Sequence, residues 1–263
     1  MDLMLQGKTA FISGSTQGIG YAIARQFLKE GAKVYVNGRT PLKTNQAVNK
    51  LKTEIAGAVV EGMPADLSNA EETNKLIADL QDIDILINNA GIFELKPFWE
   101  IKDEDWNRIF EINVMSSVRL TRSLLPKMLE KKWGRVIFIS SESGINVPEN
   151  MIHYGMTKTA MLSISNGLSK LTKGTAVTVN TILGGPTYSD GVAATVEHIA
   201  QMNNVAVDQM KELILQNTNP HSLLQRFIDP AEIAGLAAYL SSPLAVAING
   251  ASLRADGGVL NCL

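Results

Sequence analysis

The sequence predicts an α/β fold in which a parallel sheet is covered by helices on both faces. Short runs of aliphatic residues alternate with longer stretches of helical periodicity along all 263 residues. The short runs are almost continuously apolar, as in residues 83–87 and 136–139, which is typical of parallel strands buried on both faces. Because crossovers between parallel strands are right-handed, this alternation predicts a doubly wound sheet of seven strands.

The bounds of the expected elements follow from the same pattern. Strands are expected over residues 9–13, 33–37, 59–63, 83–88, 135–140, 176–183 and 252–255. Helices are expected over residues 18–30, 69–80, 102–131, 153–173 and 230–240.

Several helix ends carry recognisable signals. Ser68 followed by Glu71 resembles a capping box. Asp229 before Pro230 is typical of an N-cap with proline at the first helical position. Gly31 stands where a helix C-terminal glycine belongs.

One long segment does not fit the alternation. Residues 184–228 are too many and too mixed in composition for a simple connection, and long insertions are usually functional. We expect one or two short helices there, with residues 187–228 forming a lid over a site. With no repeat, low-complexity tract or long linker, residues 1–263 are expected to form a single domain.

Composition excludes several functional classes. A net charge of −2 gives no reason to expect nucleic acid or an anionic membrane as a partner. No run of ~18 apolar residues predicts a membrane helix, and residues 1–8 lack the features of a signal peptide. The single cysteine, Cys262, cannot form an internal disulfide, which fits the cytoplasm. His153, His198 and His221 are too far apart for a local metal motif, so no metal site is expected.

A glycine-rich turn links the first strand to the first helix. It comprises Gly14, Ser15, Thr16, Gln17, Gly18, Ile19 and Gly20. Gly14 allows the tight turn, Gly18 lacks a Cβ that would block a pyrophosphate, and Gly20 lets the helix approach the sheet. Helix amides and the helix dipole would then face the phosphates. An ordinary glycine-rich turn is the alternative, but the strand–turn–helix context favours a Rossmann-type nucleotide site.

The end of the second strand bears on the choice of cofactor. An acid there would bind the ribose 2′-hydroxyl of NAD, whereas this chain has the neutral Asn37 followed by Arg39. The Arg39 guanidinium suits a 2′-phosphate, so NADP(H) is favoured over NAD(H); a solvent-facing arginine is the alternative. Asp66 and Leu67, after the third strand, are expected beside the adenine, unless Asp66 only starts the following turn.

Ser141, Tyr154 and Lys158 form the strongest catalytic pattern in the chain. Tyr154 and Lys158 are four residues apart and so share one helix face. A phenol has a pKa of ~10, and a nearby ammonium favours its ionised form. A lowering of ~3 units corresponds to about 4 kcal/mol and requires a partly desolvated site. Such pairs also occur on solvated helices, so the pattern gains weight only from its context.

Taken together, these motifs resemble the short-chain dehydrogenase/reductase family in its compact one-domain form. The resemblance spans the whole chain and rests on Gly14, Gly18, Gly20, Asn88, Asn89, Ala90, Gly91, Asn113, Ser141, Tyr154, Lys158 and the terminal residues 256–258. Each motif is weak alone, but their order and spacing together form a strong signal.

The resemblance implies a role for each catalytic position. Tyr154 would be the general acid in carbonyl reduction and the base in the reverse reaction, and Lys158 would lower its pKa and bind the nicotinamide ribose. Ser141 would donate to the substrate oxygen as charge develops there. Asn113 would hold a water that links Lys158 to solvent, or else be a polar residue on a helix flank. Poor helix propensity favours a role for its side chain.

Other positions would contact the cofactor or depart from the family pattern. By the resemblance, Asn89, Ala90 and Gly91 would lie against the adenosine ribose, and residues 256–258 would be structural or serve subunit contact. Gly184 replaces the usual proline after the sixth strand, which leaves that turn looser. Aligning on the next glycine places Thr187 near the nicotinamide carboxamide.

The expected function is hydride transfer between NADP(H) and a carbonyl or secondary alcohol substrate. A 3-oxoacyl thioester, a steroid-like ketone and a small xenobiotic carbonyl stay open as substrates. Apolar lid residues suggest a hydrophobic compound, or merely pack the lid onto the core: Tyr188, Val192, Val196, His198, Ile199, Met202, Met210, Leu213, Leu223 and Phe227. A non-catalytic NADP-binding sensor or scaffold is the alternative, although it would need no serine, tyrosine and lysine. A nucleotide-sugar epimerase, one of the longer relatives, is disfavoured for two reasons. The glycines are spaced G-x-x-x-G-x-G and not G-x-G-x-x-G, and the C-terminal domain of those relatives is missing.

By the same resemblance, the protein is expected to be a homotetramer. Related proteins pair two long helices into a four-helix interface, and the corresponding stretches here are residues 102–131 and 153–173. The apolar candidates for that surface are Ile112, Val114, Leu120, Leu162 and Leu168.

Overall fold

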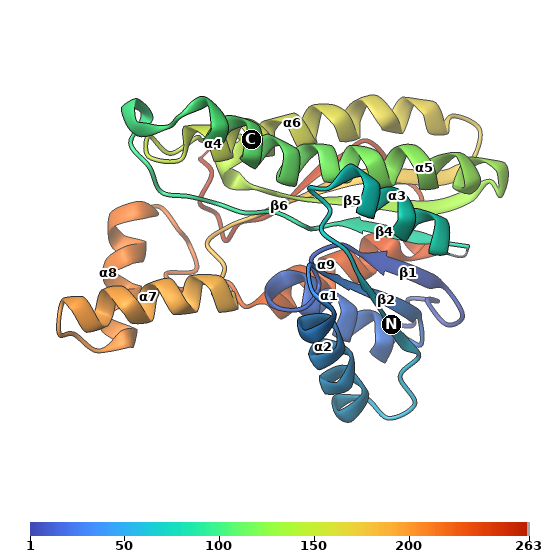
Figure 1. Ribbon diagram of the computed structural model, residues 1–263, viewed down its shortest axis with the longest axis horizontal. Coiled ribbons are helices and arrows are strands. Elements are labelled where there is room, and N and C mark those ends of the chain that lie inside the picture. The colour runs from blue at the N-terminus through green and yellow to red at the C-terminus, as the bar shows by residue number, and fades with distance from the viewer. Residues whose placement is uncertain (81, 262–263) are drawn as a thin grey trace.

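The computed structural model describes residues 1–80 and 82–261 and has one seven-stranded parallel sheet at its centre (Figure 1). The strands are β1 (Thr9–Ile12), β2 (Lys33–Gly38), β3 (Val60–Pro64), β4 (Ile85–Asn88), β5 (Trp133–Ser141), β6 (Ala176–Gly184) and β7 (Ser252–Ala255). Their order is β3-β2-β1-β4-β5-β6-β7, so the winding reverses between β1 and β4. The predicted doubly wound, seven-stranded α/β fold is therefore confirmed. Cys262 lies outside the described residues.

Helices cover both faces of the sheet in two layers (Figure 1). The α-helices are α1 (Gly18–Lys29), α2 (Pro41–Glu54), α3 (Ala70–Asp79), α4 (Asp103–Phe110), α5 (Ser116–Glu130), α6 (Ile152–Ser169), α7 (Asp190–Met202), α8 (Val207–Thr218) and α9 (Pro230–Ser241). Alternate strand residues face opposite layers. Ile85 and Ile87 pack with α1, α2 and α9, while Leu86 packs with α3, α5 and α6. This two-sided burial explains the continuous apolar runs in the sequence.

Two helical predictions need correction. Helix α2 was not expected, although Thr40 and Pro41 mark its start: the Thr40 side chain accepts from the Lys43 amide, and Pro41 occupies the first turn. The stretch 102–131 is not a single α-helix, because a π-helical turn, Glu111–Met115, separates α4 from α5.

The predicted helix caps have mixed outcomes. Ser68 is not the N-cap of α3: Asn69 accepts the first amides, and Ser68 Oγ donates to Asp66 at 2.7 Å. The cap at Asp229 is confirmed, with Glu232 completing a capping box. Gly31 ends α1 with a left-handed φ of +79°.

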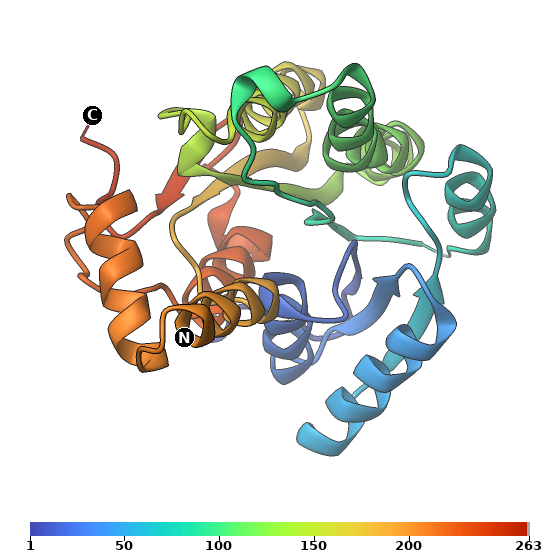
Figure 2. The same ribbon diagram turned by 60° about the vertical axis from the view of Figure 1, so that its left-hand side comes forward.

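The long segment after β6 forms two helices, α7 and α8, that project from one end of the sheet (Figure 2). Val196 and Ala200 of α7 pack against Met210 of α8 in a small cluster separate from the two sheet cores. In contrast, Met202 and Leu223 are 74% and 82% exposed. The apolar residues of the segment therefore serve partly to hold its own helices together.

In the part of the chain that the structure describes, every helix is too short or too polar to cross a membrane.

Candidate active site

A groove of about 450 Å³ lies at the carboxyl ends of β1, β2 and β4, where the strand order reverses. Ligands of doubly wound proteins bind at such a reversal. Most of the residues predicted to bind a cofactor line it: Gly14, Thr16, Gln17, Gly18, Ile19, Arg39, Asp66, Leu67, Asn89, Ala90 and Gly91. Ser15, Gly20, Tyr154, Lys158 and Thr187 are not among its lining residues.

The glycine turn has the shape that a phosphate cradle requires. Gly14 and Gly18 both have φ near +59°, a left-handed conformation that favours glycine. A Cβ on Gly14 would stand 2.9 Å from the Cα of Ala90. The side chain of Gln17, the N-cap residue of α1, makes no capping hydrogen bond. The turn therefore fits a dinucleotide phosphate, since it presents backbone amides at a helix N-terminus that lines the groove.

Two residues of the turn have structural contacts instead. Ser15 is fully buried; its hydroxyl donates to the Ile12 carbonyl at 2.7 Å and accepts from the Asn37 amide at 3.0 Å. A Cβ on Gly20 would lie 2.5 Å from Asn89 Nδ2, so Gly20 permits close helix packing. Both were predicted to contact a cofactor, but neither lines the groove, because Ser15 bonds to β1 and β2 and Gly20 packs against Asn89.

Asn37 is buried and its side chain is used within the protein. Its Oδ1 accepts from the Gly14 amide at 3.1 Å, and its Nδ2 donates to the carbonyls of Met63 and Ala65. The side chain thus braces the glycine turn. It also leaves the end of β2 without a carboxylate.

Two cations line the groove beyond β2. Arg39 is exposed there, as predicted, and Lys43 from the first turn of α2 lies with it. Lys43 was not predicted as a site residue because helix α2 was not expected. The Thr40–Pro41 start of that helix was the signal that could have revealed it.

Asp66 combines both of the roles considered for it. It lines the groove, and its Oδ1 also accepts from the amide and the hydroxyl of Ser68 at 3.0 and 2.7 Å. Its carboxylate therefore starts the turn before α3 while it borders the groove.

The segment after β6 also reaches the groove. Ser189 and Gly191 line it, and Asp190 Oδ2 accepts from the Gly18 amide at 2.6 Å. Thr187, the residue predicted from the family pattern, is buried instead, and its hydroxyl donates to the Gly185 carbonyl at 2.8 Å. Its backbone pairs with Ile228, which joins the two ends of the segment.

Ser141, Tyr154 and Lys158 lie together at the end of β5. Ser141 is the last residue of β5, and α6 carries the other two on one face. The Ser141 side chain lies close enough to the Tyr154 hydroxyl to act on its pKa, which it lowers. Lys158 Nζ lies 5.5 Å from the centre of the Tyr154 ring and donates to the Ile139 carbonyl at 3.0 Å.

The charges around Tyr154 differ from the expectation. Burial, reinforced by the negative charge of Glu142, raises the pKa of Tyr154 above its ordinary value. Burial also lowers the pKa of Lys158 to about 8, although Glu142 opposes that shift. The expected lowering of the Tyr154 pKa is therefore wrong for the protein's own groups, because burial and Glu142 together outweigh the lowering by Ser141. The phenol is held in its neutral, proton-donating form.

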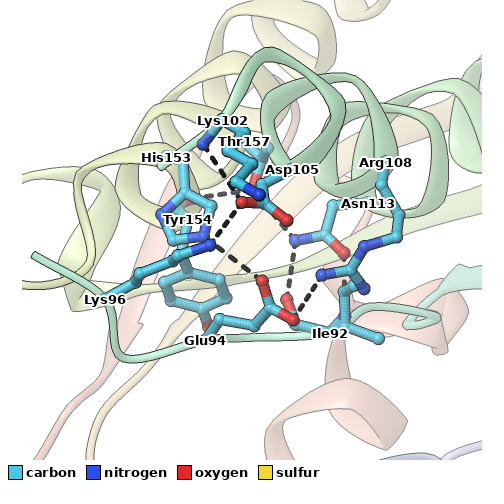
Figure 3. Close-up of polar contacts among 10 residues, drawn as sticks. All are labelled: Ile92, Glu94, Lys96, Lys102, Asp105, Arg108, Asn113, His153, Tyr154 and Thr157. Atoms are coloured by element: carbon cyan, nitrogen blue, oxygen red, sulfur yellow. Dashed lines mark hydrogen bonds and ion pairs between the residues drawn. The ribbon is translucent and has the colours of Figure 1, made fainter. Parts of the chain in front are cut away.

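Asn113 ties three elements together (Figure 3). From the π-helical turn, its Nδ2 donates to the Ile92 carbonyl at 2.9 Å and to Thr157 Oγ1 at 3.0 Å, and its Oδ1 accepts from the Ile92 amide at 2.8 Å. A Cβ on Gly91 would lie 3.3 Å from Asn113 Oδ1 and 3.7 Å from Lys158 Nζ. The side chains of Asn113 and Lys158 thus both border the space beside the Gly91 Cα.

The loop after β4 is fixed beside these residues by ion pairs (Figure 3). Glu94 pairs with Arg108, and Lys96 pairs with Asp105 at 2.5 Å. His153 is fully buried, with its Nε2 3.7 Å from the Glu94 carboxylate. These contacts hold the loop against α4 and the start of α6.

The protein has a Rossmann-type fold with a groove where the strand order reverses, and a serine, a tyrosine and a lysine lie at the same edge of the sheet. The model of the family described as short chain dehydrogenase matches residues 8–200. The chain therefore belongs to the short-chain dehydrogenase family and is an oxidoreductase of that family.

Individual relatives match over almost their whole length. The uncharacterized oxidoreductase YvaG of Bacillus subtilis (strain 168) is 48% identical over 260 residues, covering 99% of this chain and 98% of the relative. D-beta-hydroxybutyrate dehydrogenase of Cupriavidus necator is 34% identical, covering 97% and 98%. The solved structure of L-sorbose reductase from Gluconobacter frateurii, complexed with NADPH and L-sorbose, superposes with a TM-score of 0.94 at 29% identity and covers 100% of both chains.

Replacing Lys158 by Met should stabilise the fold while it removes the ammonium. Burial lowers the pKa of Lys158 from 10.5 to about 8, which corresponds to about 3 kcal/mol of cost for the charged form at pH 7. Loss of the hydrogen bond to Ile139 offsets about 1 kcal/mol of this. The unfolded chain holds this proton more tightly, so wild-type stability should rise from pH 8 to 10.5, and the advantage of Lys158→Met should fade there. Denaturant unfolding at several pH values measures it; a variant less stable than wild type at pH 7 would contradict the argument.

Proposed function

We propose that the chain is an NADP(H)-dependent enzyme that interconverts a carbonyl compound and a secondary alcohol. The supporting observation is that Ser141, Tyr154 and Lys158 lie at the same edge of the sheet as the nucleotide-shaped groove. NADPH, when bound, supplies the hydride. The glycine turn would hold its phosphates, and Asn89, Ala90 and Gly91 would lie against its adenosine ribose.

Tyr154 is the proposed proton donor to the substrate oxygen. Because burial and Glu142 raise its pKa, Tyr154 stays protonated at neutral pH, as a general acid must. Ser141 is the second donor to that oxygen, which stabilises the charge that develops there. Lys158 supplies the adjacent ammonium, and Asn113 holds the loop after β4 in place. A neutral phenol favours reduction of the carbonyl as the preferred direction.

Tyr154→Phe should abolish turnover and leave NADP(H) affinity within a few-fold of wild type. The substitution removes the proton donor, while the groove residues that would hold the cofactor are unchanged. Turnover with a panel of ketones and alcohols, followed by NADPH absorbance, measures the first effect, and fluorescence titration measures the second. More than a few per cent of wild-type activity in the variant would refute the mechanism. If wild type binds NADP(H) but turns over no compound of the panel, the result would favour the alternative of a non-catalytic sensor or scaffold.

A preference for NADP(H) over NAD(H) is supported by charge at the end of β2. Asn37 is neutral and directed inward, so no acid there would oppose a 2′-phosphate. Arg39 and Lys43 line the same end of the groove. The NADPH in the L-sorbose reductase complex agrees with this preference.

Arg39→Asp should shift the ratio of kcat/KM for NADPH over NADH toward NADH by at least tenfold. The change deletes a cation that faces a 2′-phosphate and supplies an acceptor for a 2′-hydroxyl. Lys52→Asp, an equal charge change on the exposed surface of α2, is the matched control and should leave the ratio unchanged. If Arg39→Asp also leaves it unchanged, Arg39 takes no part in cofactor selection.

Residues 187–228 are proposed to be a lid whose position responds to the cofactor. In the structure Asp190 occupies the Gly18 amide, which lies where a phosphate is expected. A bound dinucleotide would replace this carboxylate, and the segment would then settle over the site and exclude water.

Hydrogen exchange should therefore show faster exchange in residues 187–228 than in the sheet, and slower exchange there once NADP(H) is added. Asp190→Asn should raise NADP(H) affinity, because it removes a charge that competes with phosphate. Glu197→Gln, an exposed change on the same helix, is the control and should leave affinity unchanged. Protection equal to that of the sheet without cofactor would mean that the site is preformed.

A homotetramer is proposed from the family resemblance, with an altered interface. Val114 and Leu120 are buried within the chain itself, at 2% and 0% exposure, and Ile112 lines the groove. Val114 and Leu120 therefore cannot supply a subunit contact, whereas Leu162 and Leu168 of α6 are partly exposed and stay candidates. Light scattering at micromolar concentration should give four times the chain mass of 28.5 kDa; a monomer mass would refute it.

A further inference from the structure

Glu142 follows Ser141 directly and places a carboxyl group inside the catalytic cluster. Ser141 Oγ donates to Glu142 Oε2 in a short hydrogen bond, and Ser143 Oγ donates to Glu142 Oε1 at 3.2 Å. The charge of Glu142 acts on both Tyr154 and Lys158. The sequence analysis assigned Glu142 no role.

The hydrogen of the Ser141 hydroxyl is committed in this arrangement. A serine hydroxyl has one hydrogen to donate and two lone pairs to accept with. Its hydrogen goes to an ionised Glu142, and one lone pair accepts from the Ser143 amide at 3.1 Å. The second lone pair is left to accept a hydrogen bond from a substrate.

This direction conflicts with the proposed reduction. A carbonyl oxygen needs hydrogens from Tyr154 and Ser141, and the hydrogen of Ser141 is committed to Glu142. A proton on Glu142 reverses this hydrogen bond. Glu142 then donates to Ser141 Oγ, and the Ser143 amide fills the second lone pair. The hydroxyl hydrogen of Ser141 is released toward the substrate.

We propose that Glu142 is a positioning residue whose protonation state sets the direction of the Ser141 hydroxyl. Neutral Glu142 turns this hydroxyl outward for carbonyl reduction, and ionised Glu142 draws it inward, where Ser141 instead accepts from an alcohol. The inference rests on the proposed function. The proton on Glu142 is not consumed, because Tyr154 supplies the one that reaches the substrate oxygen.

The surroundings of Glu142 favour its protonated form. Burial raises its pKa, against opposing hydrogen bonds from Ser141 and Ser143. The ionisable groups that face it from α6 are Tyr154 and Lys158. Strand β6, which also packs on this turn, carries no ionisable side chain. The state with neutral Glu142, which favours reduction, is therefore fully populated below the raised pKa of Glu142 and is lost as pH rises through that pKa.

The first test is the pH dependence of reduction by the NADPH-loaded enzyme. Wild-type kcat/KM should fall about tenfold per pH unit above the Glu142 pKa, down to the level of Ser141→Ala. Glu142→Gln keeps a neutral donor beside Ser141, so its profile should lack this fall and keep only the later one from Tyr154. Glu130→Gln, an exposed change at the end of α5, should match wild type. A Glu142→Gln profile that keeps the wild-type fall would overturn the proposal.

A second test separates positioning from a general effect of charge. In a Ser141→Ala background, Glu142→Gln should no longer change the pH profile, because the proposed effect passes through the Ser141 hydroxyl. An effect of equal size in both backgrounds would overturn the proposal.

A third measurement does not depend on turnover. Infrared titration of the protein alone should show the carbonyl stretch of a buried carboxylic acid that disappears at the same pH and is missing in Glu142→Gln. The inference would be overturned if this band were absent at pH values above those at which ordinary carboxyl groups ionise. If wild type shows the band but reduces no carbonyl compound, the proposed function fails while the titration of Glu142 stands.

Discussion

The close contact between the turn after β1 and the turn after β4 is the constraint on which the rest of the active edge depends. Ser13 is buried between them, and its hydroxyl accepts from the amides of Asn89 and Ala90, both at 2.9 Å. In turn, Asn89 Nδ2 donates hydrogen bonds to the carbonyls of Ser13 and Gly14. These bonds satisfy buried backbone groups where two parallel strands end, which is a place that the sheet ladder cannot serve. Because glycine stands at position 14, the turns approach closely enough for one groove to span both.

From that contact, the remaining parts of the site are placed by the sheet. Register sets Ser141 at the end of β5 beside Gly184 of β6, and α6 returns along the sheet with Tyr154 and Lys158 directed at the same edge. Asn113 then ties the loop after β4 to α6 through Ile92 and Thr157. The π-helical turn around Asn113 is a departure from regular geometry of the kind often found at functional sites.

The catalytic end concentrates ionisable groups in a buried place, and burial decides their behaviour. Lys158 is 5% exposed, and its pKa falls, while the pKa values of Tyr154 and Glu142 rise. All three shifts disfavour charge, and each therefore costs folding free energy whenever the group is charged. A sheet whose two apolar cores are extensive can carry that cost. The same desolvation favours a proton on Glu142, which under the proposal redirects the hydroxyl of Ser141.

The sequence by itself determined the sheet, the glycine turn and the spacing of the serine, tyrosine and lysine. These are local properties: strand burial sets runs of apolar residues, a left-handed φ requires glycine, and a four-residue spacing places two side chains on one helix face. Local signals also marked the start of α2, at Thr40 and Pro41, although that helix was not expected. The N-cap of α3 is Asn69, next to the predicted Ser68.

Only the tertiary structure decided which polar groups meet across the chain. Asn37 faces inward to Gly14, Ser15 and Thr187 are occupied by backbone contacts, and Asp190 reaches Gly18 across 172 residues of sequence. No spacing in the sequence reveals such pairs, because strand order and helix packing set the distances between them. Even for Glu142, next to Ser141 in sequence, the spacing gave no sign that burial in the folded chain raises its pKa.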